Sequence, residues 1–293
     1  MGLLDRLKAG TILISDGAWG TELAKMGYSE GCPELLNIEH PDVLREIAAS
    51  YVEAGSDMIL TNTFGGNPFK LAKYGLEDRL DEFHRAAVAI SREAADGRAL
   101  VVGSMGPTGE FMAPLGLVTG DEMTEAYARQ VRAMAAEGID AILCETMTDL
   151  GEITCALRAA KENADVPVIC SMTFDKGMRG YATMMGLTPA DAAKALAEAG
   201  ADIVGSNCGA GIDNIIEVAA LMRPATTLPL WFKPNAGLPE LIEGKTVYRE
   251  LPEDMASKVP ALIEAGASIV GGCCGSTPAH IAAVRAVVDT IRK

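Results

Sequence analysis

The stretch Glu198-Ala199-Gly200-Ala201-Asp202-Ile203-Val204-Gly205-Ser206-Asn207-Cys208 predicts how this chain is built. Its first glycine is typical of the position after a helix, where a left-handed backbone conformation ends the helical hydrogen bonding. The pair Ile203-Val204 that follows is apolar throughout, which suits a parallel strand covered on both faces. The stretch therefore predicts a helix that leads directly into a buried strand, and that strand ends in a cysteine.

Related phrases occur three more times along the chain. They are Glu53-Ala54-Gly55-Ser56-Asp57, Glu137-Gly138-Ile139-Asp140 and Glu264-Ala265-Gly266-Ala267-Ser268. Each of the four phrases precedes an even-numbered member of a set of eight predicted strands. We place these strands at Ile12–Asp16, Met58–Thr63, Leu100–Ser104, Ala141–Glu145, Val168–Thr173, Ile203–Cys208, Leu230–Asn235 and Ser268–Cys273. Because helices normally connect parallel strands, and helical patterns follow these runs, the alternation predicts a (β/α)8 TIM barrel, a single domain over residues 1–293.

The composition excludes several classes of protein. The chain is 49% hydrophobic and 22% charged, which is enough apolar content for a large core. Its net charge of -15 gives no footprint for a nucleic acid or for an anionic membrane surface. No apolar run approaches the roughly 18 residues of a membrane span, and the N-terminus is too short and mixed for a signal peptide. Seven cysteines, an odd number, favour reduced thiols, so we expect a cytoplasmic protein.

Polar residues gather where the predicted strands end. They are Asp16, Asn62, Ser104, Glu145, Thr173, Cys208, Asn235 and Cys273. The carboxyl ends of the strands of a (β/α)8 barrel carry its active site. A single polar residue at a strand end is more often a turn or a cap, but eight strands that converge on one rim indicate a shared site.

Three cysteines at two of these strand ends predict a zinc site. Cys208 and the adjacent pair Cys273-Cys274 offer thiolates, which zinc prefers, and three protein ligands leave one tetrahedral position free, as in catalytic sites. A structural finger would pair cysteines two to four residues apart, whereas Cys208 and Cys273 are 65 positions apart. The alternative is that these are buried apolar cysteines, which is what we expect of Cys32, Cys144, Cys155 and Cys170.

The adjacent pair also predicts a bend in the backbone. Successive side chains of a strand point to opposite faces, so Cys273 and Cys274 could not both reach one metal from a regular strand. Gly271, Gly272 and Gly275 surround the pair and can adopt conformations that a side chain would forbid.

The motifs taken together resemble those of the homocysteine S-methyltransferase family, and most closely the homocysteine-binding barrel of cobalamin-dependent methionine synthases. The matching stretches are Asp16-Gly17-Ala18-Trp19-Gly20-Thr21, Thr61-Asn62-Thr63-Phe64-Gly65, Gly103-Ser104-Met105-Gly106-Pro107-Thr108-Gly109, Glu145-Thr146, Asn207-Cys208, Pro234-Asn235-Ala236-Gly237 and Gly271-Gly272-Cys273-Cys274-Gly275-Ser276-Thr277-Pro278. They run from residue 16 to residue 278, so the resemblance covers most of the chain.

The resemblance implies a set of roles. The zinc ligands of the family match Cys208, Cys273 and Cys274, and its amino-acid-binding positions match Asp16, Ser104 and Glu145. Asn235 is similar to a residue that lends an oxygen to zinc when substrate is absent. The implied reaction is zinc-dependent methylation of the homocysteine thiol to give methionine. We expect the methyl donor to be methylcobalamin carried by a separate corrinoid protein.

Two other functions remain open from the sequence. The same barrel could use a small donor such as S-methylmethionine or a betaine. It could instead be a non-catalytic zinc-binding or thiol-binding subunit that docks on a corrinoid protein. The sequence assigns no chemistry to Lys233, beside Asn235, or to a predicted loop over residues 177–185.

Overall fold

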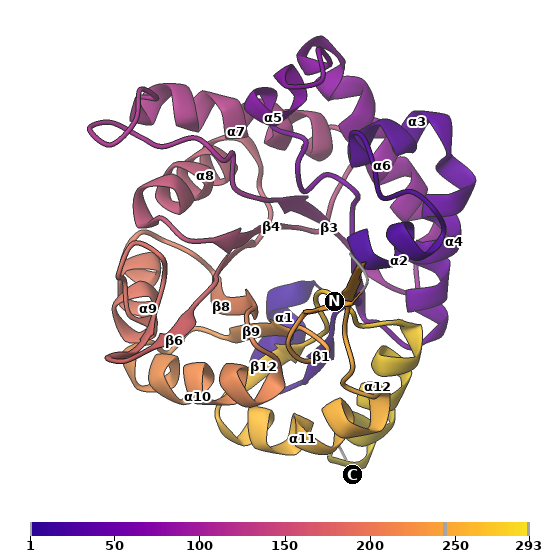
Figure 1. Ribbon diagram of the computed structural model, residues 1–293, viewed down its shortest axis with the longest axis vertical. Coiled ribbons are helices and arrows are strands. Elements are labelled where there is room, and N and C mark those ends of the chain that lie inside the picture. Colours follow the sequence, from indigo (N-terminus) through magenta and orange to yellow (C-terminus); the bar gives the residue numbers. More distant parts are fainter. Residues whose placement is uncertain (1, 243–244, 292–293) are drawn as a thin grey trace.

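The computed structural model describes residues 2–242 and 245–291, and its centre is a ring of eight parallel strands (Figure 1). The strands are β1 (Leu13–Ile14), β2 (Met58–Leu60), β3 (Leu100–Met105), β4 (Ala141–Met147), β5 (Val168–Met172), β8 (Ile203–Cys208), β9 (Leu230–Pro234) and β12 (Ala267–Val270). Their order in the sheet is β1-β12-β9-β8-β5-β4-β3-β2, and a parallel bridge between Ser15 and Met58 joins the first strand to the last. The predicted (β/α)8 barrel is confirmed.

Helices form a layer outside the strands. The longer ones are α4 (Pro41–Glu53), α6 (Leu80–Ala95), α7 (Gly120–Ala135), α8 (Leu150–Asn163), α9 (Pro189–Glu198), α10 (Ile212–Met222), α11 (Pro252–Glu264) and α12 (Pro278–Ile291). Shorter ones are α1 (Leu3–Lys8), α2 (Gly20–Lys25), α3 (Leu36–Glu39), α5 (Pro68–Ala72) and the 3₁₀ turns η1 (Pro33–Leu35), η2 (Glu77–Arg79) and η3 (Arg223–Ala225). Among the described residues, no helix combines the length and the apolarity that crossing a membrane requires.

The repeated glycines end helices as predicted. Gly55, Gly138, Gly200 and Gly266 have φ values of 96°, 78°, 95° and 112°, which is the left-handed region that a glycine adopts without strain. In α4, α9 and α11 the C-cap is the residue directly before the glycine. In α7 the C-cap is Ala136, two residues before Gly138.

The aspartate at the end of three repeats has a role that the sequence analysis missed. Asp57, Asp140 and Asp202 each accept a hydrogen bond from the backbone N–H of the preceding barrel strand, at Ile14, Val101 and Val168, over 2.7–2.8 Å. Each aspartate also pairs with at least one basic side chain. These contacts join neighbouring strands at the N-terminal end of the barrel. In the fourth repeat serine replaces aspartate at position 268, and the register between β9 and β12 shifts there.

The barrel interior is apolar toward the N-terminal ends of the strands. Every strand contributes to one buried cluster, which contains Leu13, Met58, Leu60, Val102, Ala141, Leu143, Ile169, Ile203, Trp231 and Ile269. Helix α1 closes the N-terminal end, because Leu3, Leu4 and Leu7 pack against this cluster. Side chains alternate along a strand, so the residues two or four positions further on also face the interior. Several of these are polar, including Ser104, Glu145, Ser171, Asn207 and Lys233.

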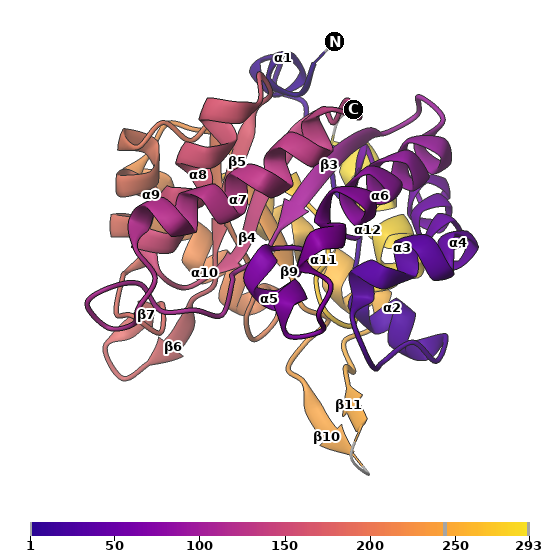
Figure 2. The same cartoon turned by 90° about the horizontal axis from the view of Figure 1, so that it is seen from above.

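Two hairpins project from the opposite, C-terminal end of the barrel (Figure 2). One consists of β6 (Asp175–Gly177) and β7 (Gly180–Ala182), and the other of β10 (Glu240–Ile242) and β11 (Lys245–Val247). The interpretation of residues 177–185 as a loop is therefore wrong for its first part, which belongs to the β6–β7 hairpin. The eighth barrel strand also ends earlier than predicted, at Val270, so Cys273 lies in the loop beyond it.

Candidate active site

The three predicted metal-binding cysteines converge at the C-terminal end of the barrel. Cys208 is the last residue of β8, and Cys273 and Cys274 follow β12. The Sγ atoms of Cys208 and Cys273 lie 3.0 Å apart, and all three sulfurs lie within 4.8 Å of one another. Among the described residues these are the only histidine, cysteine and carboxylate side chains that form such a cluster. All seven cysteines are free, and Cys155 is half-buried rather than buried.

Unusual backbone conformations hold the thiols in place. The predicted bend at the pair is confirmed, and Gly275 has a φ of 82°. Gly271 and Gly272 are needed for space rather than for conformation, because a Cβ at Gly272 would lie 2.3 Å from Ser276 Oγ. Cys208 itself has a φ of 64°, which costs a non-glycine residue of order 1–3 kcal/mol.

Asn207 connects the thiols to a neighbouring strand, a role that the sequence analysis did not identify. Its amide is fully buried, and Nδ2 lies 3.7 Å from Cys208 Sγ and 3.8 Å from Cys273 Sγ. The same Nδ2 donates to Thr146 Oγ1 over 2.7 Å, while Oδ1 accepts from Thr146 N and Ser171 Oγ. A signal was present in the sequence, since Asn207 directly precedes a predicted ligand at a strand end.

The three thiols interact with one another through hydrogen bonds. Hydrogen bonds from Cys208 and Cys273 lower the pKa of Cys274 to about 3, and the Tyr248 hydroxyl assists. Hydrogen bonding to its two neighbours raises the pKa of Cys208. Without a metal the thiolate form is therefore favoured at Cys274 and the protonated form at Cys208. Binding of a metal by all three sulfurs would release the remaining thiol protons.

Asn235 has one amide atom without a protein partner. Its Nδ2 donates to the carbonyl oxygen of Gly209 over 2.7 Å, and its Oδ1 is buried with no hydrogen bond to any described residue. A buried carbonyl oxygen without a partner costs free energy unless it binds something else. Three thiols and an unpartnered oxygen fit the ligand types that zinc accepts.

Ser104 and Glu145 form a buried pair on β3 and β4. Ser104 Oγ donates to Glu145 Oε1 over 2.6 Å. Burial raises the pKa of Glu145 to about 7, even though the nearby Lys233 ammonium and the hydrogen bond from Ser104 act in the opposite direction. The carboxyl group is therefore poised to become charged when a cation binds beside it.

Asp16 and Lys233 form a fully buried ion pair, with Oδ1 and Nζ 2.6 Å apart and side-chain exposures of 0% and 2%. Burial lowers the pKa of Lys233, but the charges of Asp16 and Glu145 outweigh this effect, so its net shift is upward. Asp16 Oδ2 also accepts from Trp19 Nε1 and from the backbone N–H of Leu60. Lys233 lines the cavity, whereas Asp16 lies behind it.

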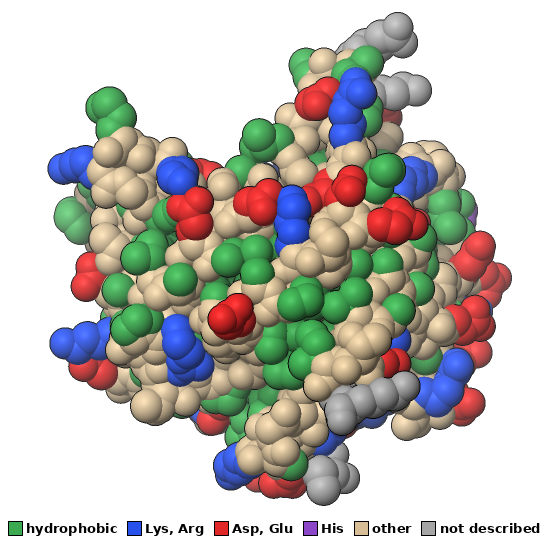
Figure 3. Space-filling model, turned by 90° about the horizontal axis from the view of Figure 1, so that it is seen from below, with side chains coloured by type: hydrophobic (Ala, Val, Ile, Leu, Met, Phe, Trp, Pro, Cys, Tyr) green, Lys and Arg blue, Asp and Glu red, His purple; other side chains and the backbone are tan. Residues whose placement is uncertain are grey.

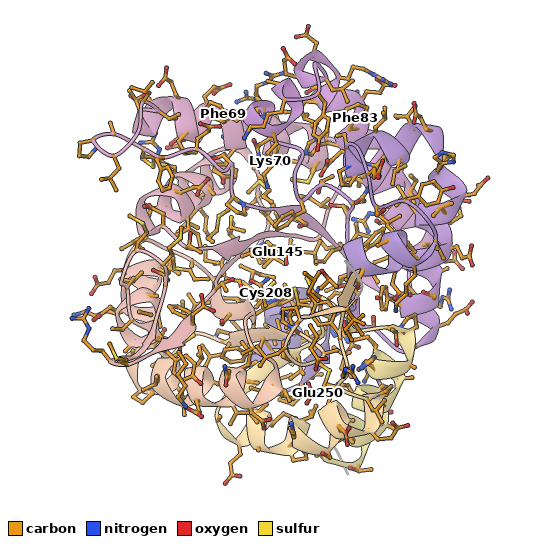
Figure 4. The ribbon with its side chains drawn as sticks, in the orientation of Figure 1. Phe69, Lys70, Phe83, Glu145, Cys208 and Glu250 are labelled. Atoms are coloured by element: carbon orange, nitrogen blue, oxygen red, sulfur yellow. The ribbon has the colours of Figure 1, made fainter. Side chains whose placement is uncertain are left out.

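One cavity of about 610 Å³ joins these groups. Its inner part contains Ser104, Glu145, Thr146, Lys233 and the three cysteines, and its outer part contains Cys32, Glu34, Phe64, Lys70, Lys73 and Tyr74. Figure 4 shows Glu145 and Cys208 at the ring of strands and Lys70 outside the ring, on α5. The sequence analysis missed this outer part. Lys70 Nζ lies 5.0 Å from the Phe64 ring centroid.

Comparisons with known proteins bear on the family and the fold of this chain. The sequence model of a family described as homocysteine S-methyltransferase matches residues 13–288. A methionine synthase of Mycobacterium tuberculosis is 34% identical over 99% of this chain, and that of Mycobacterium leprae is 34% identical over 98%. The chain spans about a quarter of the length of these relatives, 26% and 25%. The metallated form of the Escherichia coli homocysteine methyltransferase MmuM superposes with a TM-score of 0.80 at 26% identity, covering 97% of this chain and 99% of that one.

Proposed function

Because this chain belongs to the homocysteine S-methyltransferase family, we propose that it transfers a methyl group to the thiol of homocysteine and releases methionine. The observation that carries the proposal is one cavity that holds three converging thiols and, on neighbouring strands, the buried Ser104–Glu145 pair. The free thiols of this site would need the reducing conditions of the cytoplasm, where we place the protein.

Cys208, Cys273 and Cys274 are the proposed zinc ligands. Asn235 Oδ1 is the proposed fourth donor when substrate is absent, which would give this buried oxygen the partner that it lacks. Zinc bound there would keep the substrate sulfur in its thiolate form at neutral pH, and only the thiolate is a competent nucleophile. The Asn207 amide, aimed at two of the sulfurs, would keep them in place and reduce their negative charge.

The amino-acid part of the substrate would bind across β3 and β4. Glu145 would accept hydrogen bonds from the ammonium group, with Ser104 fixing the orientation of the carboxylate. Lys233 would offset part of the negative charge of Glu145 and Cys273, since it lowers the pKa values of both. The resemblance matches Asp16 to an amino-acid-binding position, but we assign it instead to positioning Lys233 and Trp19, because its two oxygens already accept hydrogen bonds from them.

For the donor we propose methylcobalamin held by a corrinoid protein. The electron pair of the substrate sulfur would form the new S–C bond, while the pair of the breaking Co–C bond would stay on cobalt. The thiol proton would leave to solvent when the substrate binds. Such a displacement needs the sulfur and the methyl carbon about 3 to 3.5 Å apart and in line, so the donor has to approach from the outer part of the cavity.

The test is methionine formation by the purified zinc protein with homocysteine and a panel of donors. We expect turnover with free methylcobalamin and faster turnover with protein-bound methylcobalamin. Turnover with S-methylmethionine or a betaine and none with either corrinoid would contradict the choice of donor. Zinc content and homocysteine binding with no turnover on any donor would instead identify a non-catalytic subunit.

Calorimetry provides a separate test of thiolate binding. Homocysteine should release about one proton near neutral pH, because its thiol must ionise to bind. The heat measured in two buffers of different ionisation enthalpy should then differ, and it should differ by more than for methionine, which has no thiol and releases only the proton of Glu145. Equal heats for homocysteine would contradict thiolate binding.

A further inference from the structure

Strand β4 contains one extra residue where it reaches the active site. Between Cys144 and Met147 this strand advances three positions while its neighbour β5 advances only two. Such an irregularity is a β-bulge, and bulges beside active sites re-aim side chains. Here two successive residues, Glu145 and Thr146, both line the cavity, which the alternation of a regular strand does not allow.

Thr146 is the residue that the bulge places in an unfavourable backbone conformation. Its φ of 61° lies in the left-handed region, where a β-branched side chain is a genuine outlier. Among the described residues other than glycine, only Asp96 and Cys208 also have a positive φ. Asp96 is the C-cap of α6, whereas Cys208 belongs to the thiol cluster. Strain of this kind persists only where surrounding contacts hold it, and it is typical of functional sites.

The contact that holds Thr146 is the side-chain amide of Asn207. The Thr146 backbone N–H donates to Asn207 Oδ1 over 2.9 Å, and Asn207 Nδ2 donates to Thr146 Oγ1 over 2.7 Å. Both ends of one buried amide therefore bind a single residue. The pair reaches from β8 to β4 and passes over β5, where Ser171 Oγ also donates to Asn207 Oδ1 over 2.7 Å. The extra residue of a bulge lacks a partner in the sheet, and here the amide supplies one.

The pair of Asn207 and Thr146 joins two halves of the proposed site. The Thr146 N–H belongs to the same planar peptide group as the Glu145 carbonyl, so holding it also fixes the backbone from which the Glu145 side chain projects. On the other side, Asn207 Nδ2 lies 3.7 Å from Cys208 Sγ and 3.8 Å from Cys273 Sγ. A change at the sulfurs that moves the amide therefore also changes the geometry at Glu145.

We infer that Thr146 is a positioning residue that couples metal binding at the three cysteines to amino-acid binding at Glu145. This inference rests on the proposed function. Sulfurs that are all ionised accept hydrogen bonds from the Asn207 amide more strongly, so the amide is held more firmly against Thr146. The Glu145 carboxyl group is then already oriented when an ammonium group arrives, and less ordering is lost on binding. By reciprocity, a bound amino acid strengthens metal binding by the same factor.

Methionine is the probe for this coupling, because it has the amino-acid part of the substrate and no thiol that must ionise. Figure 3 shows the C-terminal end of the molecule hollowed between two projections, one of which is the β10–β11 hairpin, and the cavity that Thr146 lines lies at this end. Methionine can therefore be titrated by calorimetry into the zinc-loaded and the zinc-free protein. The ratio of the two affinities measures the coupling.

Three substitutions at Thr146 separate its hydroxyl from its backbone. Thr146→Ala removes the Oγ1 acceptor and keeps the N–H, and Thr146→Ser keeps both groups. Thr146→Gly removes the acceptor and relieves the left-handed strain. The matched control is Thr173→Ala, because Thr173 Oγ1 donates over 3.1 Å to the backbone oxygen of Asn207 rather than to its side-chain amide.

We expect zinc-loaded wild type to bind methionine about ten-fold more tightly than the zinc-free protein. Thr146→Ala and Thr146→Gly should each bring this ratio close to one, whereas Thr146→Ser and Thr173→Ala should keep it. Urea denaturation should give Thr146→Gly a higher midpoint than Thr146→Ala, because only the glycine relieves the strain. Loss of coupling in both variants would then come from the missing hydroxyl and not from lower stability.

A wild-type ratio of one, or no methionine binding in either form, would overturn the inference. So would a wild-type ratio retained in Thr146→Ala, since the coupling would then act through space. An equal loss in Thr173→Ala would overturn it as well, because any weakened contact of Asn207 would have the same effect. If the ratios are as expected but no donor supports methionine formation, the proposed function fails while the coupling stands. If methionine forms and Thr146→Ala keeps the ratio, the coupling fails while the proposed function stands.

Discussion

The two ends of this barrel are built from the same eight strands and differ in almost every other respect. At the N-terminal end, Asp57, Asp140 and Asp202 make the same contact with a neighbouring strand, and α1 covers the apolar interior. At the C-terminal end the strands contribute different kinds of group, with thiols after β8 and β12, a carboxyl group on β4 and an ammonium group on β9. There a non-glycine residue, Cys208, adopts a left-handed conformation, the Oδ1 atom of Asn235 lacks a partner among the described residues, and apolar side chains remain exposed.

The difference shows where the fold is stabilised and where the chemistry occurs. The aspartate contacts at the N-terminal end pair backbone N–H groups and hold neighbouring strands together. The same residue type can make such a contact in each repeat. A site requires different groups at fixed distances, some of them strained or without a protein partner. Changes at the C-terminal end should therefore alter binding and turnover, while changes at the N-terminal end should alter stability.

The largest effect should follow replacement of a proposed zinc ligand. Cys208→Ala, Cys273→Ala or Cys274→Ala should each weaken zinc binding by more than about a hundred-fold and abolish methyl transfer, because the loss of a direct ligand exceeds the cost of losing an outer partner. Metal analysis after gel filtration measures the zinc, and Cys155→Ala is the matched control. Full zinc occupancy in the Cys208 and Cys273 variants would remove the basis for the proposed site.

A smaller effect should follow the loss of the amide that faces the sulfurs. Asn207→Asp keeps the acceptor for Thr146 N and Ser171 Oγ but removes the N–H groups that face two thiolates and adds a negative charge. We expect zinc affinity to fall about 10-fold to 100-fold in chelator competition. In the cobalt-substituted protein, the sulfur-to-metal charge-transfer band should move to lower energy.

Ser171→Ala is the control for Asn207, because it removes a hydrogen bond on the other side of the amide and leaves the sulfurs untouched. If Asn207→Asp and Ser171→Ala gave the same zinc affinity and the same spectrum, Asn207 would be a structural residue only.

The pH dependence of methionine binding tests Glu145. Its pKa is raised to about 7, so the carboxyl group is mostly neutral at pH 6 and mostly ionised at pH 8. Affinity for the ammonium group of methionine should therefore increase about ten-fold between these values, since methionine has no thiol to ionise. Glu145→Gln should bind methionine weakly at both pH values with unchanged zinc content. Titration calorimetry would measure both, and an equal rise in the glutamine variant would show that another group titrates.

The smallest effect on the site should come from the other end of the barrel. Asp202→Ala leaves the backbone N–H of Val168 and the Lys161 ammonium without this carboxylate, which should cost about 1–3 kcal/mol of unfolding free energy. Zinc content and turnover of the folded protein should match the wild type. Urea denaturation measures the loss, and Asp140→Ala should repeat it. A variant with normal stability but impaired turnover would break the division between the two ends.

The sequence alone determined the features that depend on local rules. The repeated glycines predicted where four helices end, because only a residue without a Cβ adopts a positive φ freely. The apolar runs between them predicted eight strands, and with them the end of the barrel where Cys208 and Cys273 would meet. The adjacent cysteines predicted a bend, because a regular strand cannot aim two successive side chains at one point.

Only the tertiary structure decided how the site is completed. Asp16 and Lys233 lie 217 positions apart in the sequence, and no local pattern shows that their charges neutralise each other. Asn207 faces the sulfurs because the inward side of β8 meets the loop after β12. The outer cavity, with Glu34, Lys70 and the exposed Phe64 and Tyr74, arises from connections between strands and helices whose paths depend on contacts across the barrel. The periodicity of a strand determines which of its side chains face inward. The distances between side chains on different strands come from the packing of the whole ring, and these distances decide the pKa values, charges and exposure of the site residues.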